Sequence, residues 1–266
     1  MTHRPIAMTI AGSDSSGGAG IQADLRMFSA RGVYGTTVLT ALTAQNPNTV
    51  TAVVGLEPAF VRAQIDTVLA EFPVGAVKTG MLWSAEIIET VADCVAQHQL
   101  ITVVDPVMIA TSGAKLISDD AIAKYKDVLF PHATLITPNL DEACALLDWP
   151  SIQRSRQSDA ARALYDTYGV PVLLKGGHLD GAPVELLYDG TQTYSWTHKR
   201  IDSVNTHGTG CMLAAAIAAE LAKGEALATA CAYGLDAVHH SLTSAVSLSS
   251  EHRLANIEGI PKTIKR

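Results

Sequence analysis

Short apolar runs alternate with longer segments of helical periodicity along most of this chain of 266 residues. Apolar runs next to polar or glycine-rich loops predict buried strands, and apolar residues spaced three and four apart predict the helices that cover them. The predicted strands are 6–11, 38–44, 75–78, 101–104, 135–137 and 172–174, and the predicted helices are 21–30, 58–70, 85–97, 140–147 and 159–168. Such alternation requires crossover connections and a sheet covered on both faces. We therefore expect an α/β fold, a three-layer α/β/α sandwich with a mainly parallel central sheet.

The C-terminal third adds a hairpin and two helices to this pattern. Segments 184–188 and 193–197 flank an Asp-Gly turn and predict a hairpin at one edge of the sheet. Two alanine-rich helices are expected at 210–223 and 225–241. Hydrophobic residues make up 48% of the chain but aromatic residues only 5%, so the core must consist mainly of aliphatic side chains. We expect one domain over 1–266, with a tail, 247–266, that is too weakly patterned for a structural prediction.

Charge and hydropathy exclude several classes of partner. The formal net charge is −7 and no run of Lys or Arg is long enough to follow a phosphate backbone, so we expect no nucleic-acid partner. The longest apolar run, 212–219, is too short to span a membrane. The apolar stretch near the N-terminus is too short for a signal peptide, and we expect a cytoplasmic protein.

Cys94, Cys144 and Cys231 lie in alanine-rich helical segments and are expected in the core.

The loops after the predicted strands are the expected ligand site, because ligands of open α/β sheets bind beyond the carboxyl ends of the strands. These loops are rich in glycine, carboxylates, amides and lysine, as a site for phosphate and a metal ion would be. In chain order they are 12–20, 45–46, 78–81, 105–108, 137–142, 175–178 and 205–211.

The last of these loops carries the strongest indication of chemistry. Gly208, Thr209 and Gly210 lead directly into a long predicted helix, so backbone N–H groups and the positive end of the helix dipole face an anion with no Cβ in the way. The same field is expected to lower the pKa of the Cys211 thiol, giving a thiolate that accepts a proton or attacks an electrophile. The alternative interpretation is a glycine-rich turn that only starts a buried helix.

Several chemistries compete for this loop. A P-loop ATPase is excluded because the chain contains no Gly-Lys dipeptide. A dinucleotide site at 18–23 lacks its acidic ribose partner, since no Asp or Glu lies between Asp24 and Glu57. A Cys/His transferase that uses Cys211 and His207 stays open, although it gives no role to the polar residues of the other loops. A non-catalytic vitamin-binding protein also stays open.

Seven segments of the chain together resemble a known family. They are IAGSDSSGGAGIQADL (10–25), TALTAQN (40–46), VKTGML (77–82), DPVM (105–108), ITPNLDEA (136–143), LLKGGH (173–178) and NTHGTGC (205–211). In this order they are similar to the hydroxymethylpyrimidine and phosphomethylpyrimidine kinases of thiamine biosynthesis, which belong to the ribokinase-like superfamily. Pyridoxal kinases of the same subtype are the main alternative. The resemblance covers about residues 6–240 and implies ATP and Mg²⁺ as cofactors, a small pyrimidine alcohol as substrate, and a homodimer.

The resemblance also implies roles for the glycine-rich helix start. Gly208, Thr209 and Gly210 would form the anion hole, and Cys211 would be the catalytic base near the substrate hydroxymethyl group. Most of the superfamily carries Asp at this position, whereas this subtype carries Cys. A weak base is sufficient if the transition state of phosphoryl transfer is loose.

Further residues are assigned to phosphate and metal on the same grounds. Asn139 and Glu142 resemble the N-x-x-E motif that organises Mg²⁺ and phosphate, and Asp105 is a second candidate near the metal. Lys175 is implied to reach a phosphate of ATP as a point charge, with Asn139 and His207 beside it.

The acceptor pocket is expected to contain Gln45, Asp24, Gly12, Met81 and Val107. The amide of Gln45 can accept from an exocyclic amine and donate to the adjacent ring nitrogen, which matches the edge of an aminopyrimidine. The resemblance implies this use of Gln45, and it implies that Met81 packs against the ring face.

Three positions favour the pyrimidine over pyridoxal. Pyridoxal kinases of the subtype carry an apolar residue where this chain has Gln45, and a lid cysteine near positions 109 and 110. Here those two positions are Ile109 and Ala110.

Overall fold

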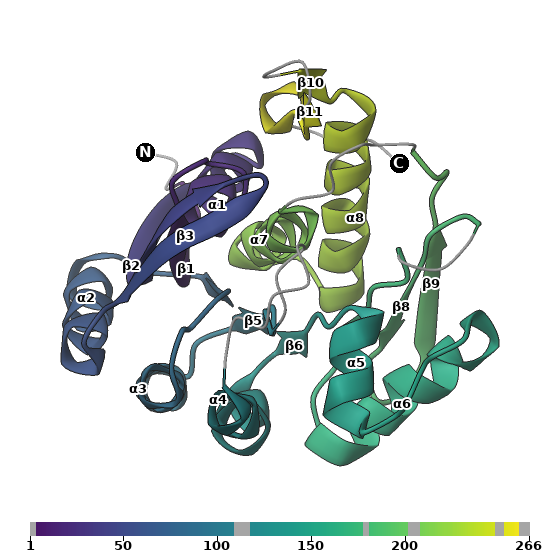
Figure 1. Cartoon of the computed structure of the whole chain (residues 1–266), viewed down its shortest axis with the longest axis horizontal. Coiled ribbons are helices and arrows are strands. Elements are labelled where there is room, and N and C mark those ends of the chain that lie inside the picture. Colours follow the sequence, from purple (N-terminus) through teal and green to yellow (C-terminus); the bar gives the residue numbers. More distant parts are fainter. Residues whose placement is uncertain (1–3, 109–117, 178–180, 202–207, 248–252, 261–266) are drawn as a thin grey trace.

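A nine-stranded sheet forms the middle layer of the computed structural model, which describes residues 4–108, 118–177, 181–201, 208–247 and 253–260. The strand order is β3-β2-β1-β4-β5-β6-β7-β8-β9 (Figure 1). The six strands from β2 to β7 in this order are parallel, whereas β3, β8 and β9 pair antiparallel with their neighbours at the two edges. The bounds are β1 Ile6–Asp14, β2 Tyr34–Asn46, β3 Thr49–Gly55, β4 Ala76–Thr79, β5 Thr102–Val104, β6 Leu135–Ile136, β7 Val172–Leu174, β8 Val184–Tyr188 and β9 Thr193–Thr197. The expected α/β fold with a mainly parallel sheet is confirmed.

Helices cover both faces of this sheet. Helices α2 to α6 contribute to the core on one face, and α1, α7 and α8 to the core on the other (Figure 1). Their bounds are α1 Gly20–Ala30, α2 Pro58–Glu71, α3 Ala85–His98, α4 Asp119–Lys124, α5 Leu140–Leu147, α6 Gln157–Tyr168, α7 Thr209–Ala222 and α8 Leu227–Thr243. Local signals fix several ends: the Ser84 hydroxyl accepts the Ile87 N–H at the start of α3, and Gly169 ends α6 with φ 68°.

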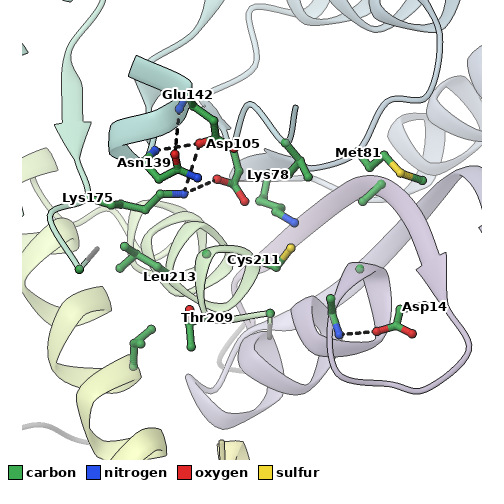
Figure 2. A pocket seen from close by; sticks show the side chains of 18 of the residues that line it. Asp14, Lys78, Met81, Asp105, Asn139, Glu142, Lys175, Thr209, Cys211 and Leu213 are labelled. Carbon is green, nitrogen blue, oxygen red and sulfur yellow. Dashed lines mark hydrogen bonds and ion pairs between the residues drawn. The ribbon is translucent and has the colours of Figure 1, made fainter. Parts of the chain in front are cut away.

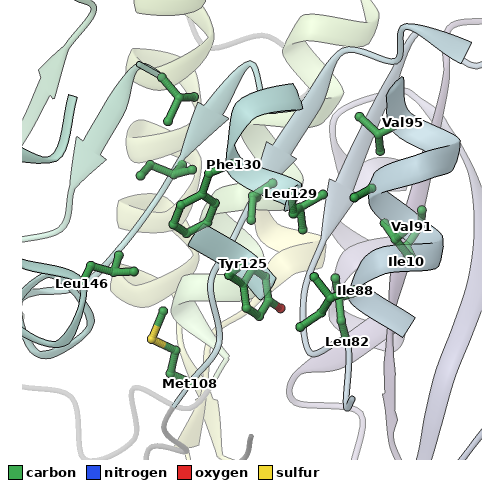
Figure 3. Close-up of a cluster of buried hydrophobic side chains, with 14 of the residues drawn as sticks. Ile10, Leu82, Ile88, Val91, Val95, Met108, Tyr125, Leu129, Phe130 and Leu146 are labelled. Carbon is green, nitrogen blue, oxygen red and sulfur yellow. The ribbon is translucent and has the colours of Figure 1, made fainter. Parts of the chain in front are cut away.

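Alternate residues of the strands supply the two cores, because side chains along a strand point to opposite faces. In β1, Met8 and Ile10 join the core under α2 to α6, whereas Ala7 joins the core under α1, α7 and α8. Figure 3 shows part of the first core, where the rings of Tyr125 and Phe130 lie with centroids 5.9 Å apart. The hydroxyl of Tyr125 donates to the carbonyl of Gly80 at 3.1 Å. This bond connects the core to the loop after β4.

Small residues bring α7 close to the sheet and to α8. Every residue of α7 from Met212 to Leu221 is buried, and five of these ten are alanine. On α8, a Cβ at Gly234 would lie 2.7 Å from Cγ1 of Ile217, so only glycine allows this approach. The close packing holds the start of α7 at the carboxyl edge of the sheet.

Two segments differ from the sequence prediction, and the tail acquires structure. The prediction omits β3, an edge strand that is largely exposed and so lacks a strong apolar signal. It also omits the helical segment 119–132, in which α4 continues into the π-helix Tyr125–Leu129 and the 3₁₀ helix Phe130–His132. In the tail, the short strands Val246–Ser247 and Arg253–Leu254 pair, and Ile257 and Ile260 are buried in the α1–α7–α8 core. Within the described residues, no helix meets the length and hydropathy needed to cross a lipid bilayer.

Candidate active site

One continuous cavity of about 530 Å³ follows the carboxyl edge of the sheet. It runs from the β2–β3 hairpin, past the start of α7, to the C-terminal half of α8, and it is walled by the loops after β1, β2, β4, β5, β6 and β7. The topology brings these loops together, as the parallel order predicts. Of the predicted site residues, the cavity is lined by Gly12, Gln45, Met81, Asp105, Val107, Asn139, Glu142, Lys175, Gly208, Thr209, Gly210 and Cys211. His207 lies outside the described residues.

The glycine-rich loops meet by backbone contact at the start of α7. Gly208 is the N-cap of the helix with φ 79°, and a Cβ there would lie 2.0 Å from the carbonyl oxygen of Gly18. Gly20 begins α1 with φ 58°, and its Cβ would lie 2.4 Å from the carbonyl oxygen of Gly12. Side chains at either position would separate these loops. Gly208 and the first residues of α7 line the cavity, so the start of the helix can bind an anion there.

Asp14, which the sequence analysis did not assign to the site, folds the first of these loops. Its carboxylate accepts the N–H and the hydroxyl of Ser16 at 2.8 and 2.7 Å, and the N–H of Ala19 at 2.9 Å. Figure 2 shows Asp14 to the right of Thr209, the first residue of α7. The Asp-Ser-Ser-Gly sequence is the local signal, because Asp commonly bonds the backbone two residues later in a turn.

A lysine and two carboxylates form the polar group on the other side of the α7 start (Figure 2). Lys175 Nζ lies 2.8 Å from Asp105 Oδ1 and 4.0 Å from Glu142 Oε2. The hydroxyl of Thr137 donates to the same oxygen of Asp105 at 3.2 Å. A Cβ at Gly210 would lie 3.2 Å from Lys175 Nζ, so the absence of a side chain lets the ammonium group approach the helix start.

Asn139 and Glu142 form a capping box at the start of α5. The Asn139 side chain accepts the Glu142 N–H at 2.9 Å, and Glu142 accepts the Asn139 N–H at 2.8 Å. Burial raises the pKa of Glu142 to about 7, with Asp105 acting in the same direction and Lys175 against it. Glu142 is therefore both a capping residue and a buried carboxylate in the cavity wall.

Lys78 belongs to one of the expected ligand loops, 78–81, but the sequence analysis assigned it no role at the site. It is the third of the four residues of β4, is fully buried, lines the cavity, and points its ammonium group toward the Cys211 sulfur (Figure 2). Its Nζ lies 2.8 Å from Asp24 Oδ2. Burial lowers the pKa of Lys78, but the charges of Asp24, Cys211 and Asp105 outweigh this effect and raise it. The sequence did contain an indication of this role, because Lys78 lies in a predicted buried strand. Lysine is almost never fully buried without a partner, so its position there predicts a buried ion pair.

The expected contact between Asp24 and substrate is corrected by this arrangement. Asp24 is fully buried and does not line the cavity. Its carboxylate lies behind Lys78 and also accepts the hydroxyl of Thr9 at 2.6 Å. Asp24 therefore holds Lys78 in place, a relation that the helical position of Asp24 could not reveal.

The expectation of a lowered pKa for Cys211 is wrong. Burial raises the pKa of the thiol above its ordinary value of 9.0, and Asp105 and Asp24 raise it further. The charge of Lys78 and a backbone hydrogen bond from Gly20 act in the opposite direction without outweighing burial. The sequence indicates that Cys211 lies at the start of a helix, but it does not show how deeply that helix start is buried, and burial decides the direction of the pKa shift.

The other cysteines follow the prediction to different degrees. Cys94 and Cys231 are buried, which confirms their place in the core. Cys144 is only half-buried and packs at the margin of the core under α2 to α6.

The opposite end of the cavity contains the residues expected to bind the acceptor. Gln45 is fixed through its backbone, whose N–H donates to and whose carbonyl accepts from the hydroxyl of Ser15, both at 2.8 Å. The hydroxyl of Thr43 lies 2.8 Å from the carbonyl oxygen of Ser13 and 3.2 Å from the side-chain oxygen of Gln45, and it can donate its one hydrogen to either. A Cβ at Gly12 would lie 2.6 Å from the Met81 methyl carbon, so glycine makes room for this thioether. The result is a pocket with an apolar face and one oriented amide.

Trp83 is a further residue at this end that the sequence analysis did not assign. It lines the cavity with φ 68°, which is unusual for a bulky side chain. A Cβ at Gly55 would lie 2.1 Å from its indole nitrogen, so the ring packs directly on the end of β3.

Comparisons with known proteins agree with this geometry. A family model described as phosphomethylpyrimidine kinase matches residues 14–256. A thiamine biosynthesis bifunctional protein of Geobacter sulfurreducens is 48% identical over 231 residues, which are 86% of this chain, and the chain spans about half (47%) of that protein. A hydroxymethylpyrimidine/phosphomethylpyrimidine kinase of Synechococcus elongatus is 49% identical over 245 residues, 90% of this chain and 93% of the relative. The solved structure of an ADP complex of Bacillus subtilis pyridoxal kinase is 35% identical, with a TM-score of 0.89 over 97% of this chain and 98% of that one.

Proposed function

Because the chain belongs to the phosphomethylpyrimidine kinase family, we propose that it phosphorylates hydroxymethylpyrimidine, and then hydroxymethylpyrimidine phosphate, at the expense of ATP. One observation carries the proposal. The start of α7 lies in one cavity between a cationic group, Lys175, and a pocket with an oriented amide, Gln45. An anion-binding element between those two ends is what phosphoryl transfer to an aminopyrimidine alcohol requires.

The start of α7 is proposed to hold the transferred phosphoryl group. The N–H groups that follow Gly208 supply donors for its equatorial oxygens, and Lys175 adds a fixed positive charge across Gly210. The acceptor oxygen forms the new bond to phosphorus, the bond to the bridging oxygen of ATP breaks, and ADP leaves. Since the transition state is loose, these groups act mainly by positioning and by neutralising charge.

Cys211 is proposed to receive the proton of the acceptor hydroxyl. It occupies the third position of α7, where its thiol reaches the side of the cavity that contains Lys78 and Met81 (Figure 2). Because burial raises its pKa, only a small fraction of the thiol is ionised at neutral pH. The positive charge of Lys78 favours the thiolate, and a late proton transfer makes little demand on the base.

Gln45 is proposed to read the aminopyrimidine edge. Its amide offers one acceptor and two donors, which match an exocyclic amine and the neighbouring ring nitrogen. Met81 and Val107 line the same pocket and supply apolar contact for the ring.

Glu142 and Asp105 are the residues proposed to hold Mg²⁺ with the phosphates of ATP. Their carboxylate oxygens suit this cation, which typically uses one or two carboxylates together with substrate phosphates and water. In the described residues, no cluster of three or more His, Cys, Asp or Glu side chains is arranged to enclose a metal. That observation fits a metal bound largely by the nucleotide, which would neutralise the charge of the phosphates.

Pyridoxal phosphorylation is the second candidate, because the Bacillus subtilis pyridoxal kinase shares nearly the whole fold. The deciding experiment compares release of ADP with hydroxymethylpyrimidine, its phosphate and pyridoxal as acceptors, under identical conditions. We expect the highest kcat/KM with the pyrimidines. ATP consumption with pyridoxal alone would overturn the assignment, and binding without turnover of any acceptor would favour a non-catalytic protein.

Three expectations stay predictions. We propose one domain because both helical layers pack on one sheet. We propose a homodimer on the basis of the family, and light scattering on the purified protein tests it. A cytoplasmic location also stays a prediction, which fractionation of the source cells tests.

A further inference from the structure

A buried carboxylate at the α8 end of the cavity has no role in the steps above. Glu185, near the start of β8, is only 8% exposed and lines the cavity. Among the described residues, its Oε2 is enclosed and has no hydrogen-bond partner. Its nearest charged neighbour is His198, whose Nδ1 lies 3.7 Å from that oxygen. A buried carboxylate whose nearest partner is an imidazole at 3.7 Å is only partly compensated among the described residues, so its retention needs an explanation.

The surroundings of Glu185 hold it in position. His198 Nε2 lies 3.4 Å from Asp236 Oδ1 on α8, and the imidazole lies against His239 with ring centroids 5.0 Å apart. Glu185 raises the pKa of His198, and Asp236 acts in the same direction. The Glu185 side chain keeps 11% of its surface exposed and lines the cavity, so it presents a carboxylate acceptor at the cavity wall.

The register of the sheet places Glu185 next to the phosphate group of the site. Leu174 of β7 pairs with Leu186 of β8, so the next pair along brings Lys175 beside Glu185. Directly opposed residues of antiparallel strands have Cβ atoms about 5 Å apart. A nucleotide whose phosphates lie on Lys175 therefore brings its ribose, the next part of the molecule, within reach of Glu185.

We propose that Glu185 accepts a hydrogen bond from a ribose hydroxyl of the bound nucleotide and thereby selects ribonucleotides over deoxyribonucleotides. The inference rests on the proposed use of ATP. A carboxylate would repel a phosphate but is a strong acceptor for a hydroxyl donor. The nucleotide would supply a hydrogen bond that the carboxylate does not receive from the described residues at normal hydrogen-bond distance.

Calorimetric titration of the full chain with ADP, 2′-deoxyADP, 3′-deoxyADP and IDP tests the proposal without requiring turnover. For Glu185→Ala we expect ADP affinity to fall about tenfold or more, the size typical of a hydrogen bond to a charged group. Affinity for the deoxynucleotide that lacks the contacted hydroxyl should change less than about twofold, and Glu185→Gln should give an intermediate result. Asp236→Asn is the matched control, because it disturbs the same His198 cluster from outside the cavity wall and should leave the ratio of ADP to deoxyADP affinity unchanged.

Each other outcome overturns the inference. Equal losses for all four nucleotides, or the same change in ratio with Asp236→Asn, would show that the cluster only connects the edge hairpin to α8. A selective change with IDP would assign the contact to the 6-amino group of the base instead of the ribose. Thermal melting must show that Glu185→Ala and Glu185→Gln are folded. If Glu185→Ala is unfolded, the ratio of ADP to deoxyADP affinity of Glu185→Gln decides the question. If the variants keep the wild-type ratio of ADP to deoxyADP affinity while the protein phosphorylates its acceptor, this inference is rejected and the proposed function stands. If ADP binding depends on Glu185 and on the ribose hydroxyl but no acceptor is phosphorylated, the inference stands and the proposed function is rejected.

Discussion

Replacing Lys78 by Met tests whether the ion pair behind Cys211 is required for the stability of the fold. Lys78 Nζ and Asp24 Oδ2 are 2.8 Å apart, and neither side chain is exposed. Met fills a similar volume but leaves the Asp24 carboxylate in the interior without its cation. Because breaking a buried pair by removing one partner costs about 3–5 kcal/mol, we expect the free energy of unfolding to fall by that amount at pH 8.

The loss in Lys78→Met should shrink as the pH falls. Burial raises the pKa of Asp24 even with Lys78 in place, and without Lys78 the native carboxyl should hold its proton to a still higher pH. The unfolded carboxyl releases its proton near the ordinary value of 3.8, so the native state binds more protons above that pH. The stability of the variant therefore falls as the pH rises from 3.8 to the native pKa of Asp24.

Urea unfolding followed by circular dichroism measures these effects. The double variant Lys78→Met/Asp24→Asn removes both charges and should be more stable than the sum of the single losses predicts by about 2 kcal/mol or more. Lys124→Met, which removes a cation paired with Glu89 at the surface, is the control and should change stability little. Additive single losses, or a loss for Lys78→Met no larger than for Lys124→Met, would refute the reasoning.

Four further predictions concern turnover. Cys211→Ala should keep ligand affinity but lose about 10²-fold or more in kcat, measured by steady-state kinetics. Cys94→Ala and Cys231→Ala are the controls, which should change thermal stability and leave kcat near normal. A normal kcat for Cys211→Ala would remove Cys211 from the mechanism. The raised pKa of Cys211 predicts that kcat rises with pH on the alkaline side, and Cys211→Asp should flatten the rise, which a pH–rate profile checks. Glu142→Gln should raise the Mg²⁺ concentration needed for half-maximal rate without changing pyrimidine affinity, and an unchanged Mg²⁺ titration would leave Glu142 as a helix cap. Gln45→Met should lower the ratio of kcat/KM for hydroxymethylpyrimidine over pyridoxal by roughly 30-fold, because only the pyrimidine loses two hydrogen bonds. Equal losses of kcat/KM for both substrates would mean that Gln45 only shapes the pocket.

Several features of this protein follow from the sequence alone because they depend on short-range patterns. The parallel strands and their helices were predicted from periodicity, and the site loops from the rule that ligands bind at the carboxyl edge. The capping box of Asn139 and Glu142 needs only a spacing of three residues, and the left-handed turn at Gly208 needs only a glycine before a helix. The exposed strand β3 was missed since its sequence buries too little apolar surface to show a pattern.

Other features were decided only by the tertiary structure, because they depend on burial and on residues far apart in the chain. Lys78 and Asp24 are separated by 54 positions, and neither position shows a periodic signal for the other. The pKa of Cys211 rises because α7 starts deep in the molecule beside two carboxylates, whereas the sequence displayed only the helix start that would lower it. Desolvation and charge act over distances of a few ångströms in space, and those distances are set by how the sheet brings β1, β4, β5 and α7 together.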